Sequence, residues 1–407
     1  MEPDGGGTFR VMTATLDPTT DELRDAAREL AQRRFASRAA EWDEREEWPE
    51  ENERILADLG YMGFLIPEEY GGLGRSFLDA VVVLEEFAKA CFTTALVCHL
   101  FINGPARTIT VVGSEEFKRR MLPGCATGEK FVVIAVSEPD AGSAVTDLTC
   151  RADVQADGSL VLNGRKSWVT GGGRCTHALV FVRFGPQPSS GARGIGAVVV
   201  PRDTPGFSIG RTDRKMGGRG TPESELIFED CRLGAEWILV PGDPANTSGF
   251  KTLMTAFGAE RLGNCALCLG ASQAAYDASV AFMLERHQFG RPIAEFQGLQ
   301  WKVADMAIKL AAGRALLHDA ARKAGRGFPT PWDTAVAKTY INESAQEICS
   351  TAIQLHGHHG YTVEAGIERH YRDVRGMALG GGTPEILRNT IASLVFGRSF
   401  SQRRDGS

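Results

Sequence analysis

The sequence lacks the features that mark membrane, secreted and nucleic-acid-binding proteins. Its apolar runs, of which Phe131–Val136 is among the longest, fall short of the ~18 residues that a membrane-spanning helix needs. The first residues, MEPDGGGTFRVM, contain neither the basic region nor the apolar core of a signal peptide. Basic residues are outnumbered, 45 against 51 acidic, which disfavours the neutralisation of nucleic-acid phosphates. We therefore expect a soluble, cytoplasmic protein with no membrane or nucleic-acid partner.

Cysteine is present in an odd number, nine, within a chain of 407 residues that can build its own core. This usage predicts reduced thiols rather than a disulfide framework. Cys265 and Cys268 form a CxxC pair, but they lie in a helix-like stretch, which disfavours a redox or zinc role.

Metal ligation is not expected either. A cluster of histidines near the C-terminus has no acidic or thiol ligand at a matching spacing. These histidines are His356, His358, His359 and, further along, His370.

The hydrophobic patterns divide the chain into three parts after a short leader. We expect an α+β multidomain protein with a disordered leader (1–18), an N-terminal helical domain (19–130), a middle antiparallel β-barrel domain (131–246) and a C-terminal four-helix bundle (247–407). In the first domain, Thr19 and Glu22 predict a capping box, and a long apolar helix is expected from Phe77 towards Thr108.

Turn and cap signals refine the other two domains. Asn163-Gly164 predicts a hairpin turn between β-branched segments. The absence of proline between Pro244 and Pro292 permits a very long first bundle helix. Further bundle helices are expected at about Pro292–Gly325, from Thr330 and from Thr383; in the last two, proline follows the capping threonine.

Three segments could carry chemistry. Ala135–Ser143 is a Pro-, Asp- and Gly-containing turn after a strand, able to cradle a phosphate or a ring edge, although an ordinary loop is the plainer interpretation. Trp168 and Thr170 lie two apart on a strand, so both should face one side, where they could contact a planar heterocycle or simply pack in the barrel. Arg286 lies between two long helices, where it could cap carbonyls or bind a diphosphate.

In this order, the motifs resemble those of the acyl-CoA dehydrogenase family. The resemblance spans about residues 20–400 and rests on seven segments in register: IPEEYGGLG, SEPDAGS, NGRKSWVTGGG, KMGGRGTPESELIFEDCRL, RHQFGRPI, QLHGHHGY and YRDVRGMALGGGTPEILRN. It implies the fold of that family, with FAD bound between the β domain and the bundle.

The resemblance also implies which residues hold FAD. Ser137 would bond the flavin ring, Ser143 the pyrophosphate, Trp168 would pack along the isoalloxazine, and Thr170 would contact its N5 edge. Other residues would reach the cofactor of a neighbouring subunit. The complete expected set is Val136, Ser137, Gly142, Ser143, Trp168, Thr170, Arg286, Gln288, Phe289, Gln297, Gln354, Gly357 and Thr383.

The catalytic base is displaced relative to most of the family. The glutamate of the family's EGT turn is replaced here by Gly381. A subgroup similar to isovaleryl- and long-chain acyl-CoA dehydrogenases carries its base before an arginine on the first bundle helix, which matches Glu260 and Arg261. The 25 residues from Arg261 to Arg286 fit the family spacing. No cation lies one turn from Glu260, and its small, apolar neighbours favour desolvation, which makes a carboxylate a stronger base; a surface glutamate is the plainer alternative.

The thioester carbonyl would be polarised by the flavin ribityl hydroxyl and the backbone N–H of Gly381. The glycine run Gly380–Gly382 predicts room for a branched or wide acyl group. His99 could recognise a polar acyl tail or be a satisfied core histidine. The expected substrate contacts are Ser143, Arg261, Leu96, Leu100 and Gly382.

The resemblance implies α,β-dehydrogenation of an acyl-CoA to a trans-2-enoyl-CoA, with Glu260 taking the α-proton and flavin N5 the β-hydride. The expected partners are an acyl-CoA or acyl-carrier-protein thioester, an electron-transferring flavoprotein, and further copies of the chain in a homo-oligomer, as a tetramer. Two alternatives stand beside it: a flavin oxidase or monooxygenase of the same fold, and a non-catalytic subunit that completes a partner's site.

Overall fold

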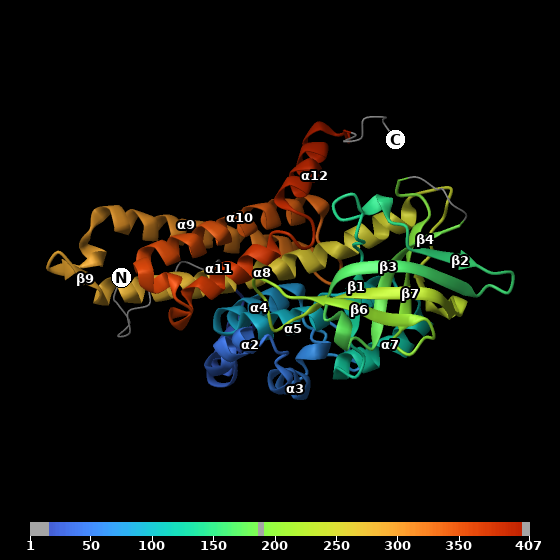
Figure 1. Ribbon diagram of the computed structural model, residues 1–407, viewed down its shortest axis with the longest axis horizontal. Helices are drawn as coiled ribbons and strands as arrows, with labels where there is room; N and C mark the ends of the chain where they lie inside the picture. Colours follow the sequence, from blue (N-terminus) through green and yellow to red (C-terminus); the bar gives the residue numbers. More distant parts are fainter. Residues whose placement is uncertain (1–15, 186–190, 401–407) are drawn as a thin grey trace.

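The computed structural model describes residues 16–185 and 191–400. A mixed β-sheet lies at one end of the molecule, a long helical bundle extends from it, and the N-terminal helices pack along the bundle (Figure 1). The predicted leader lies almost entirely outside the described residues. The predicted order of helical, β and helical parts is confirmed.

Seven α-helices form the N-terminal part: α1 (Pro18–Leu30), α2 (Ala39–Arg45), α3 (Glu50–Asp58), α4 (Phe77–Ala90), α5 (Phe92–Ile102), α6 (Pro105–Val112) and α7 (Glu115–Thr127). The first begins earlier than predicted. Asp17, not Thr19, caps it by accepting a hydrogen bond from the Thr20 backbone, and Pro18 occupies its first turn.

The prediction of a single apolar helix from Phe77 towards Thr108 is wrong, because the helix is interrupted twice. Cys91 adopts an extended conformation between α4 and α5, and Gly104 separates α5 from α6. The segment Phe92–Val112 has the length and composition of a membrane span, which the sequence analysis did not recognise, but 83% of its apolar window is buried inside the protein. The breaks redirect α5 so that one of its faces meets the bundle.

The middle part is a sheet of eight strands: β1 (Val132–Ala135), β2 (Arg151–Val154), β3 (Leu160–Thr170), β4 (His177–Phe184), β5 (Ile195–Pro201), β6 (Phe207–Asp213), β7 (Glu223–Leu233) and β8 (Ile238–Val240). The hydrogen-bonded path runs β6-β7-β3-β2-β4-β5-β8, with β1 beside β4. Most pairings are antiparallel, as predicted, but β1 and β2 each pair with β4 in parallel. Within the described residues the path ends at β6 and β8, so the sheet is mixed and not a closed antiparallel barrel.

The hairpin turn predicted at Asn163-Gly164 is wrong. Both residues lie inside β3, at a register shift, and Gly164 has a φ of +142°. A Cβ there would lie 2.6 Å from the Cα of Cys150, and Asn163 bonds across to Asp230 of β7. The turn between β2 and β3 lies instead around Gly158. Asn-Gly signals a positive φ, which a β-bulge uses as well as a turn.

The C-terminal part contains α8 (Ser248–Glu285), α9 (Gln297–Ala324), α10 (Pro331–His356), α11 (Ile367–Met377) and α12 (Pro384–Phe396), with a small hairpin, β9 (His287–Gln288) and β10 (Arg291–Pro292), between α8 and α9. The long first helix and the threonine caps of α10 and α12 are confirmed. The fourth helix of the bundle is α11, which the sequence analysis missed, whereas α12 projects away from the body (Figure 1).

A buried ion pair joins the N-terminal helices to the bundle. Arg314 of α9 donates from Nε to Glu85 Oε1 of α4 at 2.8 Å, and also to Gln273 of α8. Burial opposes ionisation of Glu85, but Arg314 holds the pKa of this carboxyl below its usual value. The pair therefore fixes α4, α8 and α9 relative to one another.

We predict that Arg314→Met destabilises the protein by about 3 kcal/mol, because it leaves a buried carboxylate without its partner. The free energy of unfolding, measured by denaturant titration, tests this. The double variant Glu85→Gln/Arg314→Met should recover part of the loss. A single variant as stable as the parent would contradict the account.

Candidate functional site

The turn after β1 is anchored to β3 by a buried ion pair. Lys166 Nζ donates to Glu138 Oε1 at 2.8 Å and to the Val136 carbonyl at 2.9 Å. Glu138 also accepts the backbone N–H groups of Thr149 and Cys150. Neither Glu138 nor Lys166 was among the predicted site residues, although their opposite charges in two neighbouring motifs were a signal for an ion pair. They give this turn a fixed position.

The predicted cofactor residues of the β domain lie together around this turn. The Ser167 N–H donates to the Ser137 carbonyl at 2.9 Å, which places the turn beside Trp168. Gly142 and Ser143 are exposed. Trp168 is 49% exposed and has a φ of +56°, at a register shift before the buried Val169. Trp168 and Thr170 therefore flank a buried residue and both lie off the core, although the strand between them is irregular.

A second group of predicted cofactor residues lies at the far end of the bundle. Arg286, Gln288, Gln354 and Gly357 line one pocket of about 560 Å³. The neighbouring predicted residues, Phe289 and Gln297, are exposed, Phe289 to 93%.

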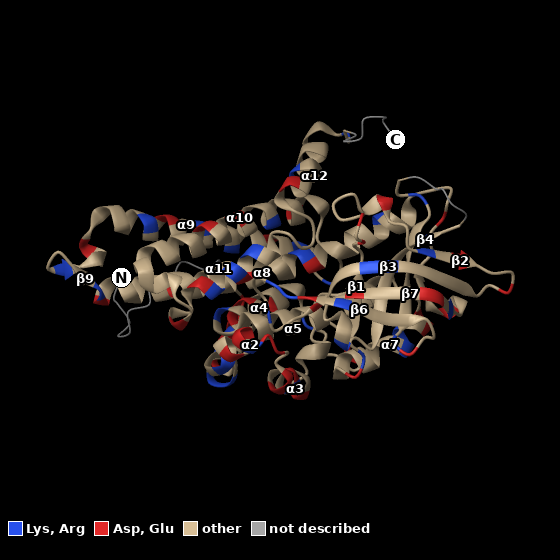
Figure 2. Ribbon diagram, viewed as in Figure 1, with Lys and Arg blue, Asp and Glu red and all other residues tan. Residues whose placement is uncertain are grey.

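The β9 hairpin and the sheet lie at opposite ends of the long axis of the molecule (Figure 1). Lys and Arg residues flank the β9 hairpin (Figure 2). Within a single chain, the two sets of predicted cofactor residues are therefore far apart.

The histidines of the GHHG turn do not form a metal site. His356 and His359 both stack on Phe282, whereas the nearest ring to His358 is that of Tyr361. Among the described residues, no group of three or more His, Cys, Asp or Glu is placed to hold a metal ion. The left-handed position of the turn is Gly357, with a φ of +62°, so His358 occupies a position that accepts a side chain.

Glu260 lies on α8 where this helix meets α5. Its Oε1 lies 2.9 Å from His99 Nε2, and His99 Nδ1 lies 3.3 Å from Asn103 Nδ2. Its other oxygen, Oε2, is shielded from solvent and has no hydrogen-bond partner. The absence of cations one turn away on α8 is as predicted, but the partner on α5 was missed because it is 161 residues distant in the chain.

Apart from His99 and the capping residue Asn103, the face of α5 that meets Glu260 is apolar. Leu96, His99, Leu100 and Asn103 recur at helical spacing, and all four are buried. Leu96 and Leu100 are the acyl-contact residues predicted from the sequence, so the structure places them on the same face as the partner of Glu260.

The Gly380–Gly382 turn is held by two cations, the partly buried Arg261 and the fully buried Lys338. Arg261 Nε donates to the Gly381 carbonyl at 2.7 Å, and Lys338 Nζ donates to the Gly382 carbonyl at 3.3 Å. Burial lowers the pKa of Arg261 to about 10 and that of Lys338 to about 8. Among the described residues neither cation has a carboxylate partner, so the turn lies in a positive environment. Arg261 thus contacts this turn, and its predicted contact with substrate stays a prediction.

Gly381 has a φ of +74°, and a Cβ there would lie 3.4 Å from Lys338 Cε and 3.6 Å from Arg261 Cγ. A glutamate at this position would be strained, which agrees with a base located elsewhere. Thr383, which follows the turn, caps α12 by accepting a hydrogen bond from the Ile386 N–H.

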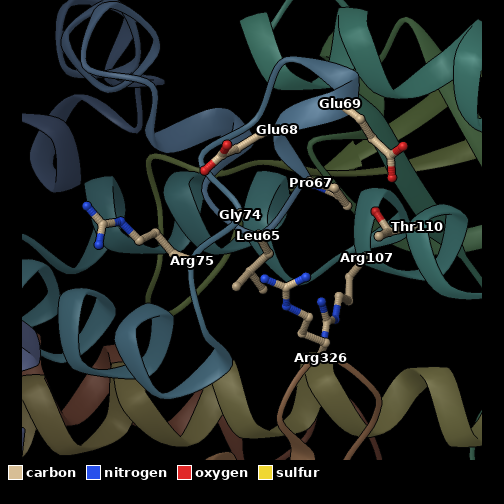
Figure 3. Close-up of a pocket in the computed structure, with 9 residues that line it drawn as sticks. All are labelled: Leu65, Pro67, Glu68, Glu69, Gly74, Arg75, Arg107, Thr110 and Arg326. Atoms are coloured by element: carbon tan, nitrogen blue, oxygen red, sulfur yellow. The ribbon is translucent and has the colours of Figure 1, made fainter.

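Another recess, of about 330 Å³, lies between the Pro67–Gly74 turn, α6 and the connection from α9 to α10. Arg107 and Arg326 lie beside each other on one side of it, with Glu68 and Glu69 on the other (Figure 3). Arg107 donates to the Gly327 carbonyl. None of the predicted catalytic, cofactor or substrate residues lines this recess, so it is separate from the site around Glu260.

Family comparisons cover all three parts of the chain. Family models of acyl-CoA dehydrogenases match with their N-terminal domain at residues 17–129, their middle domain at 133–231 and their C-terminal domain at 247–396. A 3-sulfinopropanoyl-CoA desulfinase from Variovorax paradoxus is 41% identical over 95% of this chain and 96% of that protein. An acryloyl-CoA reductase (NADH) from Anaerotignum propionicum is 37% identical over 95% and 97%.

Solved structures agree with the family match. Butyryl-CoA dehydrogenase from Megasphaera elsdenii superposes with a TM-score of 0.89 at 30% identity, covering 95% of this chain and 100% of that one. A related glutaryl-CoA dehydrogenase from Mycobacterium smegmatis was solved in complex with FADH2. The chain therefore belongs to the acyl-CoA dehydrogenase family, and it is an FAD-dependent oxidoreductase that acts on acyl-CoA thioesters.

Proposed function

We propose that this enzyme catalyses α,β-dehydrogenation of an acyl-CoA to a trans-2-enoyl-CoA, with Glu260 as the acceptor of the α-proton. The observation that carries the proposal is the Glu260 carboxylate itself. It lies at the α5–α8 contact, where its side chain is 18% exposed; one oxygen is bound by His99, and the other is shielded from solvent and has no partner. A carboxylate oxygen without hydrogen bonds is the more basic one, because hydrogen bonds to the charged form stabilise it.

The Gly380–Gly382 turn supports the other half of the reaction. Abstraction of an α-proton places negative charge on the thioester oxygen, which donors and cations in a dry site stabilise. Arg261 and Lys338 fix the turn by its carbonyls and surround it with positive charge. We propose that the Gly381 N–H donates to the thioester oxygen, as the family resemblance implies.

The residues present fit FAD. Trp168 offers a half-exposed ring beside the exposed turn of Gly142 and Ser143, and Gly142 and Gly357 have open space where a Cβ would be. Arg286 supplies a cation for the diphosphate in its pocket. Bound FAD supplies the acceptor for the β-hydride.

We propose that each FAD site is completed by a second copy of the chain. The two sets of cofactor residues lie at opposite ends of one chain, and large apolar side chains are exposed at the bundle end and along α9, notably Phe289, Trp301 and Ile308. Such exposure on a folded domain marks a contact surface. A tetramer, an electron-transferring flavoprotein as oxidant and a cytoplasmic location complete the proposal.

The names of the relatives bear on the direction of the reaction. A reductase of acryloyl-CoA returns hydrogen to a conjugated thioester, and the same carboxylate would then supply the α-proton. The enoyl thioester is shared by both directions, so Glu260 has the same position in each. The acyl group itself we propose to be branched or wide, because three successive glycines border the site.

Glu260→Gln should lower the rate of flavin bleaching by an acyl-CoA, under anaerobic conditions, on the order of a thousandfold. A panel of straight, branched, aromatic and dicarboxylic acyl-CoAs identifies the best substrate first. Glu285→Gln, at the other end of α8, is the matched control and should bleach normally. Undiminished reduction by Glu260→Gln would refute the assignment, and rapid reoxidation in air with peroxide formation would instead indicate an oxidase.

Arg286→Met should weaken FAD retention on the order of tenfold, because it removes a charged hydrogen-bond donor. The ratio of flavin absorbance to protein after gel filtration measures the effect, and Arg291→Met in the same hairpin serves as control. Mixed oligomers of Arg286→Met and Glu260→Gln chains should retain more FAD and be more active than the average of the two variants measured separately. Values no higher than that average would mean that one chain completes its own site.

A further inference from the structure

His99 is a buried polar side chain in an otherwise apolar stretch of α5. It is only 2% exposed, and both ring nitrogens have partners, Glu260 on one side and Asn103 on the other. Asn103 caps the C-terminus of the same helix, one turn later, and is also 2% exposed. The three side chains therefore form a chain of hydrogen bonds that leads from α5 to the base on α8.

The chemistry of the partners sets the direction of these bonds. Asn103 presents its amide nitrogen, which can only donate, so His99 Nδ1 accepts. The proton of the neutral imidazole is then on Nε2, which donates to Glu260 Oε1. The opposite arrangement would set two acceptors, Nε2 and a carboxylate oxygen, against each other.

A glycine on α8 makes this contact possible. Gly263 lies one turn after Glu260, and a Cβ there would lie 2.2 Å from two atoms of the His99 ring and 2.6 Å from Asn103 Nδ2. Any side chain at this position would displace the imidazole. The close approach of the ring to α8 thus depends on Gly263.

No other charged group near Glu260 is bonded to it in the described residues. Arg261, the next residue of α8, donates to the Gly381 carbonyl, and Lys338 of α10 bonds Asn342 and two carbonyls. Arg107 of α6 donates to the Gly327 carbonyl. His99 alone of these groups reaches the carboxylate.

We propose that His99 is a positioning residue that holds Oε1 of Glu260 and thereby makes Oε2 the atom that takes the proton. This rests on the proposed dehydrogenation. The α C–H bond breaks and an O–H bond forms at Oε2, and the released electron pair enters the new Cα=Cβ bond as the β-hydride leaves to the oxidised cofactor. Oε2 lies on the side of Gly104, 3.9 Å from where a Cβ of that residue would be, at the break between α5 and α6.

The test compares His99→Phe, which keeps a planar ring but has no donor, with His99→Gln, whose amide can still donate to Oε1. Stopped-flow reduction of the holoenzyme with the best acyl-CoA of the panel gives the limiting rate and the substrate dissociation constant separately. His99→Phe should lower the limiting rate on the order of tenfold to a hundredfold, with the dissociation constant changed by less than about twofold. His99→Gln should restore most of the rate, and His318→Phe, which replaces a buried histidine on α9, should leave it unchanged.

A second variant covers the case in which His99→Phe does not fold. Gly263→Ala places a better helix former on α8, but its methyl group would displace the imidazole, so it should lower the limiting rate in the same way. A limiting rate equal to the parent's in His99→Phe, or in a folded Gly263→Ala, would overturn the inference. If Glu260→Gln is inactive while His99→Phe is not, only this inference fails; if Glu260→Gln is fully active, the proposed function itself fails.

Discussion

The site depends on keeping one oxygen of a carboxylate away from water and from other polar groups. Moving an ion of this size into a protein interior costs several kcal/mol unless polar groups replace its hydration. Glu260 receives one such group, the His99 N–H, and its second oxygen has none. The arrangement depends on the contact between α5 and α8. Gly263, which has no side chain, lets the His99 ring approach α8, and Gly104, between α5 and α6, lies beside Glu260 Oε2.

The turn of Gly380–Gly382 is the counterpart of this carboxylate. In most of the family this turn carries the base, whereas here its left-handed glycine disfavours any side chain. Two cations, the partly buried Arg261 and the buried Lys338, donate to its carbonyls, and among the described residues neither has a carboxylate partner. Negative charge that develops on a thioester would therefore meet a positive environment, while the base approaches from α8. Because proton abstraction is assigned to α8, the Gly380–Gly382 turn needs only its backbone to stabilise charge on the thioester.

The sequence was a good guide to the parts that local pattern determines. Helical periodicity and proline-threonine caps predicted α10 and α12, and the family resemblance grouped Arg286, Gln354 and Gly357, which line one pocket. Local signals failed where one pattern serves two structures. Asn163-Gly164 formed a bulge rather than a turn, and the apolar stretch after Phe77 broke at Cys91, a residue with no breaker signature.

The contacts that position the site could not be read from the sequence, because they join distant segments. His99 reaches Glu260, and Lys338 reaches the Gly382 carbonyl, only once the helices have packed. The measurement that tests the central claim most directly is exchange at the α-carbon. The holoenzyme is incubated with an acyl-CoA in D2O, and deuterium at the α-position is followed by NMR. We predict incorporation by the parent enzyme and none by Glu260→Gln; equal incorporation by both would show that another group removes the α-proton.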